Sequence, residues 1–379
     1  MRPEAVEAML PYLGERYGNP SGAHAMAREA RKAIDESRDV VADVLGVEPN
    51  EIVFTGGGTE ADNLAVLGTH DRAGGVVVGS AIEHHAVLEA IERRGGRLVP
   101  VDAHGVLDLE ALATTLDEVR DAGETVSLVS VMLANNEVGA IQPLPKIARL
   151  VRRHAPDALL HTDAVQALSW LDVAPLVRDA DLISISAHKF GGPKGVGALA
   201  VRERAHGRLA PRAIGGGQER ERRGGTQNVA GIVAMAVAAR ATHDTRAATV
   251  ERVGKLRDRL AGGLLASVAD VIETGVPRAA DGTPDRTGRV AGICHLCFDH
   301  IESESLLFLL EKAEVYASAA SSCASGAMEP SHVLAAMGVP RDLAFGSLRL
   351  SLGWASTDAD VDAALAAVPP AVERLRAFA

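Results

Sequence analysis

The fold is decided by residues 159–201, which read LLHTDAVQALSWLDVAPLVRDADLISISAHKFGGPKGVGALAV. Three strand-like runs, at 159–162, 182–186 and 197–201, are separated by polar or glycine-rich stretches. An aspartate follows the first run and a His-Lys pair follows the second. Short runs of this kind, with few charges, are typical of strands that are covered on both faces. The stretch therefore predicts neighbouring strands of a buried, mainly parallel sheet.

Similar runs continue toward the N-terminus and alternate with amphipathic helical stretches. This alternation predicts crossover units, an α/β fold and a mainly parallel sheet of seven strands. Ligands then belong at the carboxyl ends of the strands. The upstream strands are expected at 51–54, 76–78, 98–101 and 126–133.

The C-terminal part of the chain has a different pattern. An alanine-rich helical stretch over 228–268 would carry the chain out of the large domain, and the remainder predicts a small α+β domain. We expect a large domain at 21–240 and a small domain at 241–379, which also includes an N-terminal segment at 1–20. The remaining elements are expected as helices at 3–17, 24–45, 303–312, after Pro330 and after Thr357, with strands at 292–298 and 347–352.

Charge and composition exclude several classes of protein. The net charge is −11 and no run of Lys or Arg exceeds two residues, which argues against nucleic acid or an anionic membrane surface as a partner. No apolar run approaches the roughly 18 to 20 residues of a membrane helix. The N-terminus carries no signal-peptide pattern and there are three cysteines, so we expect a cytoplasmic protein without disulfides.

A glycine-rich turn at 55–60, TGGGTE, follows an expected strand and opens an expected helix. Bare backbone amides and the positive end of a helix dipole can together hold a phosphate there. The alternative is a turn that binds no ligand. The spacing also imitates a dinucleotide fingerprint, but no acidic residue ends a strand about 20 residues further on.

Asp163 and Lys189 each follow a strand and are separated by one crossover unit, so both side chains should emerge at the same edge of the sheet. They could form a simple salt bridge. However, Ser186, His188 and the turn at 191–195 surround the lysine with hydrogen-bond donors and tight backbone. This arrangement suits a lysine that binds pyridoxal phosphate covalently while a carboxylate holds the ring nitrogen protonated.

Three further polar positions are candidates for the same site. His84 follows the strand at 76–78 and could stack on a flat ring, or it could be a surface group at a helix start. Asn136 lies after the strand at 126–133 and would either brace a turn or meet a ligand oxygen. Arg349 interrupts an apolar strand and would bind either a structural carboxylate or the carboxylate of an amino acid.

The three cysteines fall into two groups. Cys323 lies in a stretch of very small residues at 317–326, so we expect an accessible thiol that acts as a nucleophile. Cys294 and Cys297 resemble half of a zinc site, but positions i and i+3 of a strand point to opposite faces and no second pair exists. We interpret them as core residues, and no metal site is expected.

Taken together, these motifs resemble those of the pyridoxal-phosphate-dependent cysteine desulfurases, in the class V aminotransferase group. The resemblance implies a fold-type I transferase. Members of this family carry a further strand and an Ala-Ala-Thr-Thr-Pro-like segment before the helix that begins here at Pro3. The matching motifs are at 17–20, 54–63, 83–84, 135–139, 161–166, 186–189, 191–197, 215–228 and 323–334.

The resemblance implies a role for each matching residue. Lys189 would hold the cofactor, His84 would stack on its ring and Cys323 would accept sulfur. Thr226 would reach the phosphate across a homodimer interface, and Arg349 with Asn136 would bind the substrate. The other implied contacts are Asp163 with the ring nitrogen, Asn136 and Gln166 with the ring hydroxyl, and Gly58, Thr59, Ser186 and His188 with the phosphate.

The implied activity converts L-cysteine to L-alanine and passes the sulfur, as a persulfide on Cys323, to an acceptor protein. That acceptor would be an iron–sulfur scaffold or a tRNA-thiolation enzyme. Two rivals have the same fold, an aminotransferase and a selenocysteine lyase. A third is a non-catalytic binding protein, which the missing N-terminal segment makes credible.

Overall fold

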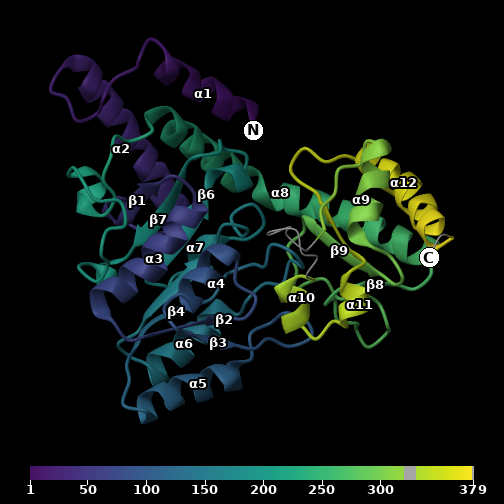
Figure 1. Cartoon of the computed structure of the whole chain (residues 1–379). Coiled ribbons are helices and arrows are strands. Elements are labelled where there is room, and N and C mark those ends of the chain that lie inside the picture. Colours follow the sequence, from purple (N-terminus) through teal and green to yellow (C-terminus); the bar gives the residue numbers. More distant parts are fainter. Residues whose placement is uncertain (320–329, 378–379) are drawn as a thin grey trace. The chain divides into compact units, whose positions relative to one another are not determined.

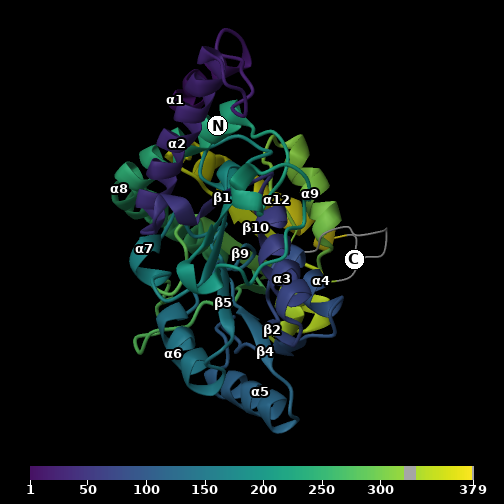
Figure 2. The same cartoon turned by 90° about the vertical axis from the view of Figure 1, so that its left-hand side faces the viewer.

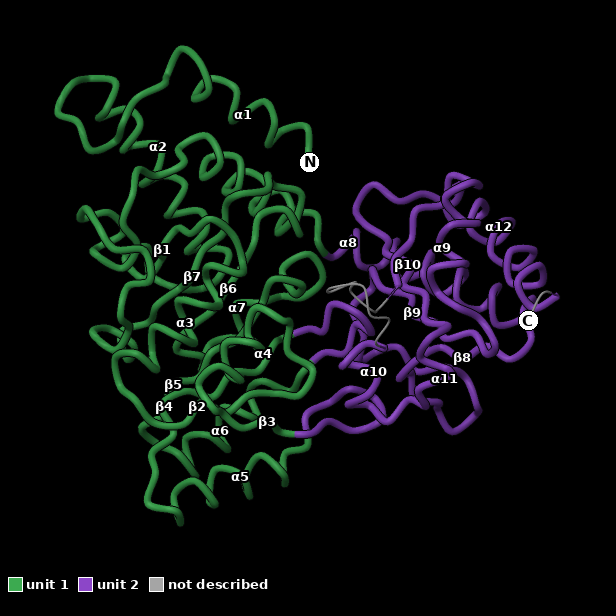
Figure 3. Tube along the Cα trace, in the orientation of Figure 1, with its two compact units in different colours: residues 1–99, 108–133, 142–246 green, residues 100–107, 134–141, 247–379 purple. Residues whose placement is uncertain are grey.

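The computed structural model describes residues 1–319 and 330–377 of the chain (Figure 1). These residues divide into two compact units, which Figure 3 draws in green and purple. Unit 1 contains residues 1–99, 108–133 and 142–246, and unit 2 contains 100–107, 134–141 and 247–379. Among the described residues, no helix is both long and apolar enough to cross a membrane.

Unit 1 is built on the predicted seven-stranded sheet, with strand order β1-β7-β6-β5-β4-β2-β3. Only β7 runs antiparallel to its neighbours, so the sheet is mainly parallel, as expected. The strands are β1 (Ile52–Thr55), β2 (Val76–Ser80), β3 (Arg97–Val99), β4 (Val126–Ser130), β5 (Leu159–Asp163), β6 (Leu182–Ser186) and β7 (Gly197–Val201).

Helices cover both faces of this sheet, which explains why its central strands are buried along their whole length. Figure 2 shows α3 (Gly58–Ala73) and α4 (His85–Glu92) on one side of the sheet and α6 (Leu144–His154) and α7 (Val173–Leu176) on the other. The other helices of unit 1 are α1 (Pro3–Leu13), α2 (Ala25–Leu45), α5 (Leu109–Asp121) and the first part of α8 (Val229–Ser267).

Unit 2 contains a three-stranded antiparallel sheet with order β10-β9-β8. Its strands are β8 (Val271–Glu273), β9 (Ile293–Phe298) and β10 (Ser347–Ser351). The buried guanidinium of Arg289 donates to the carbonyls of His104 and Val138, and so ties the two short segments of unit 2 to the rest of it. The helices are α9 (Ser303–Lys312), α10 (His332–Ala336), α11 (Arg341–Ala344), α12 (Asp358–Arg376) and the remainder of α8.

The division differs from the expected domains in three respects. Residues 1–20 belong to unit 1 and not to the smaller unit, because the backbone amide of Arg2 donates to Gly191 O at 2.8 Å. The short segments 100–107 and 134–141 belong to unit 2. The boundary on α8 falls after Arg246 and not after residue 240, inside the continuous helix that the alanine-rich pattern predicted.

Candidate functional site

The carboxyl edge of the unit 1 sheet carries a row of buried polar side chains. Five strands there end in a residue that can donate or accept a hydrogen bond. Four of these strands are otherwise largely apolar, whereas β5 also carries His161 and Thr162. The carboxyl ends of parallel strands are where ligands bind in such sheets. The five are Thr55, Ser80, Ser130, Asp163 and Ser186.

Asp163 ends β5 and Lys189 follows the neighbouring strand β6 at this edge. Asp163 is the last residue of β5 and is 5 % exposed, and its Oδ1 accepts a hydrogen bond of 2.8 Å from the amide of Val165. Lys189 is exposed in the turn after β6, and its carbonyl accepts from the Ser169 hydroxyl at 3.0 Å. Burial raises the pKa of Asp163 to about 6, and the Val165 amide and the charge of Lys189 act in the opposite direction.

A layer of buried titratable groups lies behind Asp163. Asp62, on α3, and Glu83, which accepts from the Met132 amide at 2.7 Å, are both fully buried. Burial raises the pKa of each well above its ordinary value, and the charge of Asp163 adds to this effect. Burial lowers the pKa of His161 to about 3, so this ring is neutral. Among these three acids, Asp163 is the one whose pKa the charge of Lys189 lowers.

His161 is fixed by two serine hydroxyls. Its Nδ1 lies 2.8 Å from Ser130 Oγ and its Nε2 lies 3.0 Å from Ser184 Oγ. The Oδ1 atom of Asp62 is 3.6 Å from the same Nε2. The sequence analysis did not identify Asp62 or His161 as site residues. The signal available for Asp62 was its charge, because it lies among apolar and small residues in the first half of α3.

The glycine-rich turn lies beside Ser186. Gly57 has φ +152, and a Cβ on Gly58 would approach Val165 Cγ2 to 2.8 Å and Ser186 Cβ to 3.3 Å, so glycine is needed here. Gly58 and the exposed Thr59 open α3, a helix of 16 residues. The Ser186 hydroxyl lies 2.9 Å from His188 Nδ1. Free amides, a hydroxyl and a helix N-terminus together can hold a phosphate.

His84 and Gln166 lie near the same edge. His84 is exposed at the N-cap of α4, where its Nδ1 accepts from the Ala86 amide at 3.1 Å. Asn63 of α3 donates to Ala86 O at 3.1 Å, which joins the start of α4 to the helix that follows the glycine turn. Gln166 is half-buried, three residues after Asp163. Thr226 is exposed in the loop before α8.

Asn136 and Arg349 are together in unit 2. Arg349 Nη1 donates to Asn136 O at 3.0 Å, and Arg349 pairs through its backbone with Ser318. The neighbouring Glu137 accepts from the Ser331 hydroxyl, and burial raises its pKa to about 7. Ser318 precedes the undescribed residues 320–329, and Cys323, the expected nucleophile, lies outside the described residues.

Cys294 and Cys297 are buried in β9, in agreement with their interpretation as core residues. Burial raises the pKa of these thiols to about 12 and about 11, respectively. Neither thiolate forms near neutral pH, so neither cysteine can serve as a nucleophile.

The family profile for class V aminotransferases matches residues 1–364. The cysteine desulfurase IscS of Methanosarcina thermophila is 42 % identical, over 99 % of this chain and 90 % of its own length. The IscS-like cysteine desulfurase of Mycobacterium tuberculosis is 41 % identical, over 99 % of this chain and 94 % of its own.

Solved structures agree with these relatives. A NifS-like protein superimposes with a TM-score of 0.85 at 34 % identity, covering all of this chain and 96 % of the other. A NifS-like protein from Rickettsia africae gives the same TM-score and coverage at 28 % identity. The expected fold-type I arrangement is therefore confirmed, and the chain belongs to the class V aminotransferases and, within them, to the cysteine desulfurases.

Proposed function

We propose that this chain binds pyridoxal 5'-phosphate at the carboxyl edge of the unit 1 sheet and uses it to desulfurate L-cysteine. The observation that carries the proposal is the pairing of a buried acid, Asp163, with an exposed amine, Lys189, whose charge acts on that acid. A solved structure titled SspA in complex with cysteine, at 28 % identity and a TM-score of 0.75, supports the choice of substrate.

The residues present fit this cofactor. Asp163 is the single acid of the buried layer that faces an amine, and Gly58 leaves the space beside Ser186 that a side chain would fill. Lys189 would hold the cofactor and Asp163 its ring nitrogen. When bound, the cofactor supplies an electron sink for the amino acid's Cα. His84 would stack on the ring, Gln166 would contact its hydroxyl, and the phosphate would lie at Gly58, Thr59, Ser186 and His188.

The Lys189 amine would take the proton from the Cα of the substrate. Arg349 would bind the substrate carboxylate through its planar guanidinium. Asn136, whose carbonyl accepts from Arg349 Nη1, would contact both the ring hydroxyl and the substrate. The pairing of β10 with β9 and the bridge to Ser318 hold the backbone of Arg349.

Cys323 would accept the sulfur. Its thiolate attacks the sulfur of the substrate, an S–S bond forms, and the bond between sulfur and Cβ breaks. The electron pair of that bond stays with Cβ, which gains a proton, so that alanine leaves and Cys323 carries a persulfide. The two sulfur atoms of the new S–S bond together lose the two electrons that reduce Cβ, so no external oxidant is needed. An acceptor protein, an iron–sulfur scaffold or a tRNA-thiolation enzyme, then removes the persulfide sulfur.

The mass of the protein before and after incubation with L-cysteine tests this function. We expect one added sulfur on the peptide that contains Cys323, and none after Cys323→Ser. That variant should keep the visible absorption of the bound cofactor and lose alanine formation in the presence of a reductant. Turnover retained by Cys323→Ser would contradict the role of Cys323.

The same assay separates the rival activities. An aminotransferase needs a keto-acid acceptor and leaves the cofactor in its amine form, so alanine formed without such an acceptor excludes it. Selenocysteine used with a much higher kcat/KM than cysteine would identify a selenocysteine lyase. A purified protein that stays colourless after reconstitution would indicate a binding protein.

Cytoplasmic location and a homodimer complete the proposal. Thr226 is exposed in the loop before α8, which supports a role at a second copy of the chain. Mixing cofactor-free Lys189→Ala protein with Thr226→Ala protein tests this role. A dimer that shares phosphate contacts should contain one intact site per mixed dimer and regain activity.

A further inference from the structure

The loop at 215–228 has an unusual backbone. Three consecutive residues that are not glycine, Glu219, Arg220 and Glu221, have φ of +48, +57 and +63. The left-handed conformation is unfavourable for each such residue, because Cβ comes too close to the carbonyl oxygen. A strained run of this kind persists only where the surrounding structure holds it, and such runs concentrate at functional sites.

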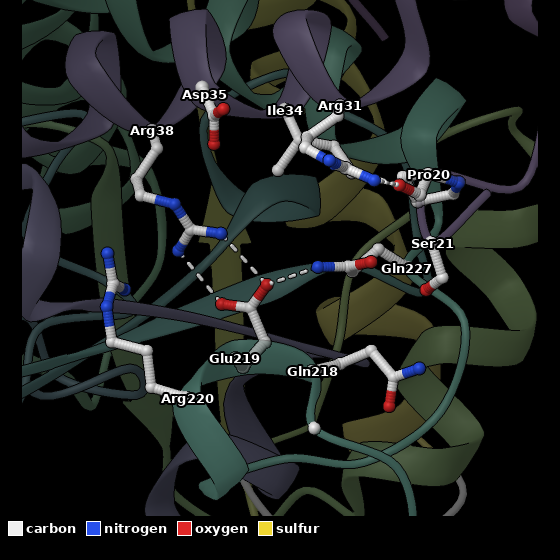
Figure 4. A pocket seen from close by; sticks show the side chains of 11 residues that line it. Pro20, Ser21, Arg31, Ile34, Asp35, Arg38, Gln218, Glu219, Arg220 and Gln227 are labelled. Carbon is white, nitrogen blue, oxygen red and sulfur yellow. Dashed lines mark hydrogen bonds and ion pairs between the residues drawn. The ribbon is translucent and has the colours of Figure 1, made fainter. Parts of the chain in front are cut away.

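One anchor of the loop is the buried carboxylate of Glu219 (Figure 4), which lines a cavity of about 500 Å³. It accepts two hydrogen bonds of 2.9 Å from Arg38, one of 3.0 Å from Gln227 Nε2 and one of 2.9 Å from the amide of Phe54. Burial alone would raise the pKa of Glu219, but Arg38 and the other donors outweigh it and hold the pKa below its ordinary value. The loop is thereby joined to β1.

A second anchor joins the loop to the glycine turn. Arg223 Nε donates to Glu60 Oε1 at 2.9 Å, and Glu60 Oε2 accepts from the amide of Gly56 at 2.7 Å. The two anchors thus hold alternate amides of the segment that leaves β1, those of Phe54 and Gly56. The amides at the start of α3 are left to face an incoming anion.

Glu60 creates an electrostatic problem at this position. Its carboxylate binds an amide of the same turn that would receive a phosphate, and like charges so close together repel. Arg223 is the cation in hydrogen-bond contact with this carboxylate, and both side chains are largely shielded from solvent, at 25 % and 33 % exposed. Screening by water is therefore reduced, and the charge of Arg223 matters more than it would on an open surface.

We propose that Arg223 is a positioning residue for the cofactor phosphate. Arg223 neutralises Glu60 and so allows the glycine turn to accept a dianion. Glu219 supports this role by holding the strained loop in the conformation from which Arg223 reaches Glu60. The inference rests on the proposed function, since it takes the cofactor phosphate to lie at the start of α3.

The test is a titration of cofactor-free protein with pyridoxal 5'-phosphate, with the Kd read from the visible absorption. We expect Arg223→Ala to raise the Kd by about tenfold to a hundredfold. Glu60→Gln keeps an acceptor for the Gly56 amide but removes the charge, so the double variant Glu60→Gln with Arg223→Ala should recover most of the affinity. Arg223→Lys should lie between wild type and Arg223→Ala.

A second readout follows the phosphate itself. The phosphorus NMR shift of the bound cofactor should change in Arg223→Ala and return in the double variant. Arg240→Ala, which breaks the ion pair with Asp43 between α8 and α2, is the matched control and should leave both the Kd and the shift unchanged.

Two results would overturn the inference. A double variant as weak as Arg223→Ala would assign Arg223 a purely structural role, and an unchanged Kd in Arg223→Ala would remove the role altogether. Either result, with normal binding by wild type, leaves the proposed function intact. A wild-type protein that binds no cofactor would instead overturn the proposed function, and the inference with it.

Discussion

Two buried carboxylates of unit 1, Asp163 and Glu219, have similar exposure, but their pKa values are shifted in opposite directions. Asp163 is 5 % exposed and its pKa is raised to about 6, whereas Glu219 is 4 % exposed and its pKa is lowered. The difference lies in the donors. Four donors, two of them from a guanidinium, surround Glu219, while Asp163 accepts from one backbone amide and faces the charge of Lys189.

The comparison shows that burial raises the cost of a charge and that the surrounding groups decide whether the cost is met. At Glu219 the four hydrogen-bond donors offset the cost of burying the charge, and the loop is held in place. At Asp163 the Val165 amide and the charge of Lys189 offset this cost only in part. This leaves a carboxylate that can accept a hydrogen bond from a protonated ring nitrogen. We regard the first as a structural site and the second as a reactive one.

The largest effect should follow a change at the reactive site. Asp163→Asn removes the charge that would keep the ring nitrogen protonated, so we expect turnover to fall by about 10²–10³-fold. Alanine formation from L-cysteine measures it, and the visible spectrum confirms that the cofactor remains bound. Activity within a factor of two of wild type would show that the acid is not part of the site.

The structural site should respond in stability. Glu219→Gln leaves Arg38 with an unpaired buried charge, so the free energy of unfolding should drop by about 3–5 kcal/mol. Urea denaturation of the cofactor-free protein measures this loss. Glu251→Gln, which breaks an exposed pair with Lys255 on α8, is the control and should leave the urea midpoint unchanged. Equal urea midpoints for both variants would contradict the stabilising role of the Glu219 anchor.

The pH dependence of stability should also separate the two acids. Because folding raises the pKa of Asp163 from 3.8 to about 6, the folded state binds the extra proton, and this stability is lost as the pH rises from 4 to 6. The loss is about 3 kcal/mol in the cofactor-free protein. Glu219 acts with the opposite sign, since its pKa is lowered. The difference between wild type and Asp163→Asn isolates the contribution of Asp163, and a difference that is flat over this range would refute it.

The smallest effect should come from the same chemical change at a third acid. Asp62 is buried, and burial raises its pKa well above its ordinary value, which favours the neutral acid. Asp62→Asn therefore replaces one neutral group by another and should change the free energy of unfolding by less than about 1 kcal/mol. A loss as large as that of Glu219→Gln would show that Asp62 is ionised, which the same urea experiment detects.

Local pattern predicted most of the secondary structure. The strand at 182–186 and the helix at 303–312 were placed at their observed ends, because apolar runs and helical periodicity are local signals. Helix α1 ends at Leu13 and not at 17, since Pro11 and Gly14 weaken its last turn. The edge strand β8 was not predicted, because its two apolar residues, Val271 and Ile272, are flanked by Asp270 and Glu273.

Contacts between distant residues were not predictable in this way. Asp163 and Lys189 could be paired because strand ends meet at one edge of a parallel sheet, and the electrostatic effect of one on the other agrees with this. Arg38 and Glu219 are 181 residues apart and share no motif, so nothing local joins them. The roles of Lys189, His84 and Cys323 were predicted from their local sequence and are also implied by the resemblance, and they stay predictions.

The covalent attachment of the cofactor tests the central claim most directly. Protein reconstituted with pyridoxal 5'-phosphate would be reduced with borohydride, which makes the link to lysine permanent, and then mapped by peptide mass. The account predicts a pyridoxyl group on Lys189 and none on Lys194, which lies five residues away and has no acid partner among the described contacts. A label on Lys194 or on another lysine, or no label at all, would contradict it.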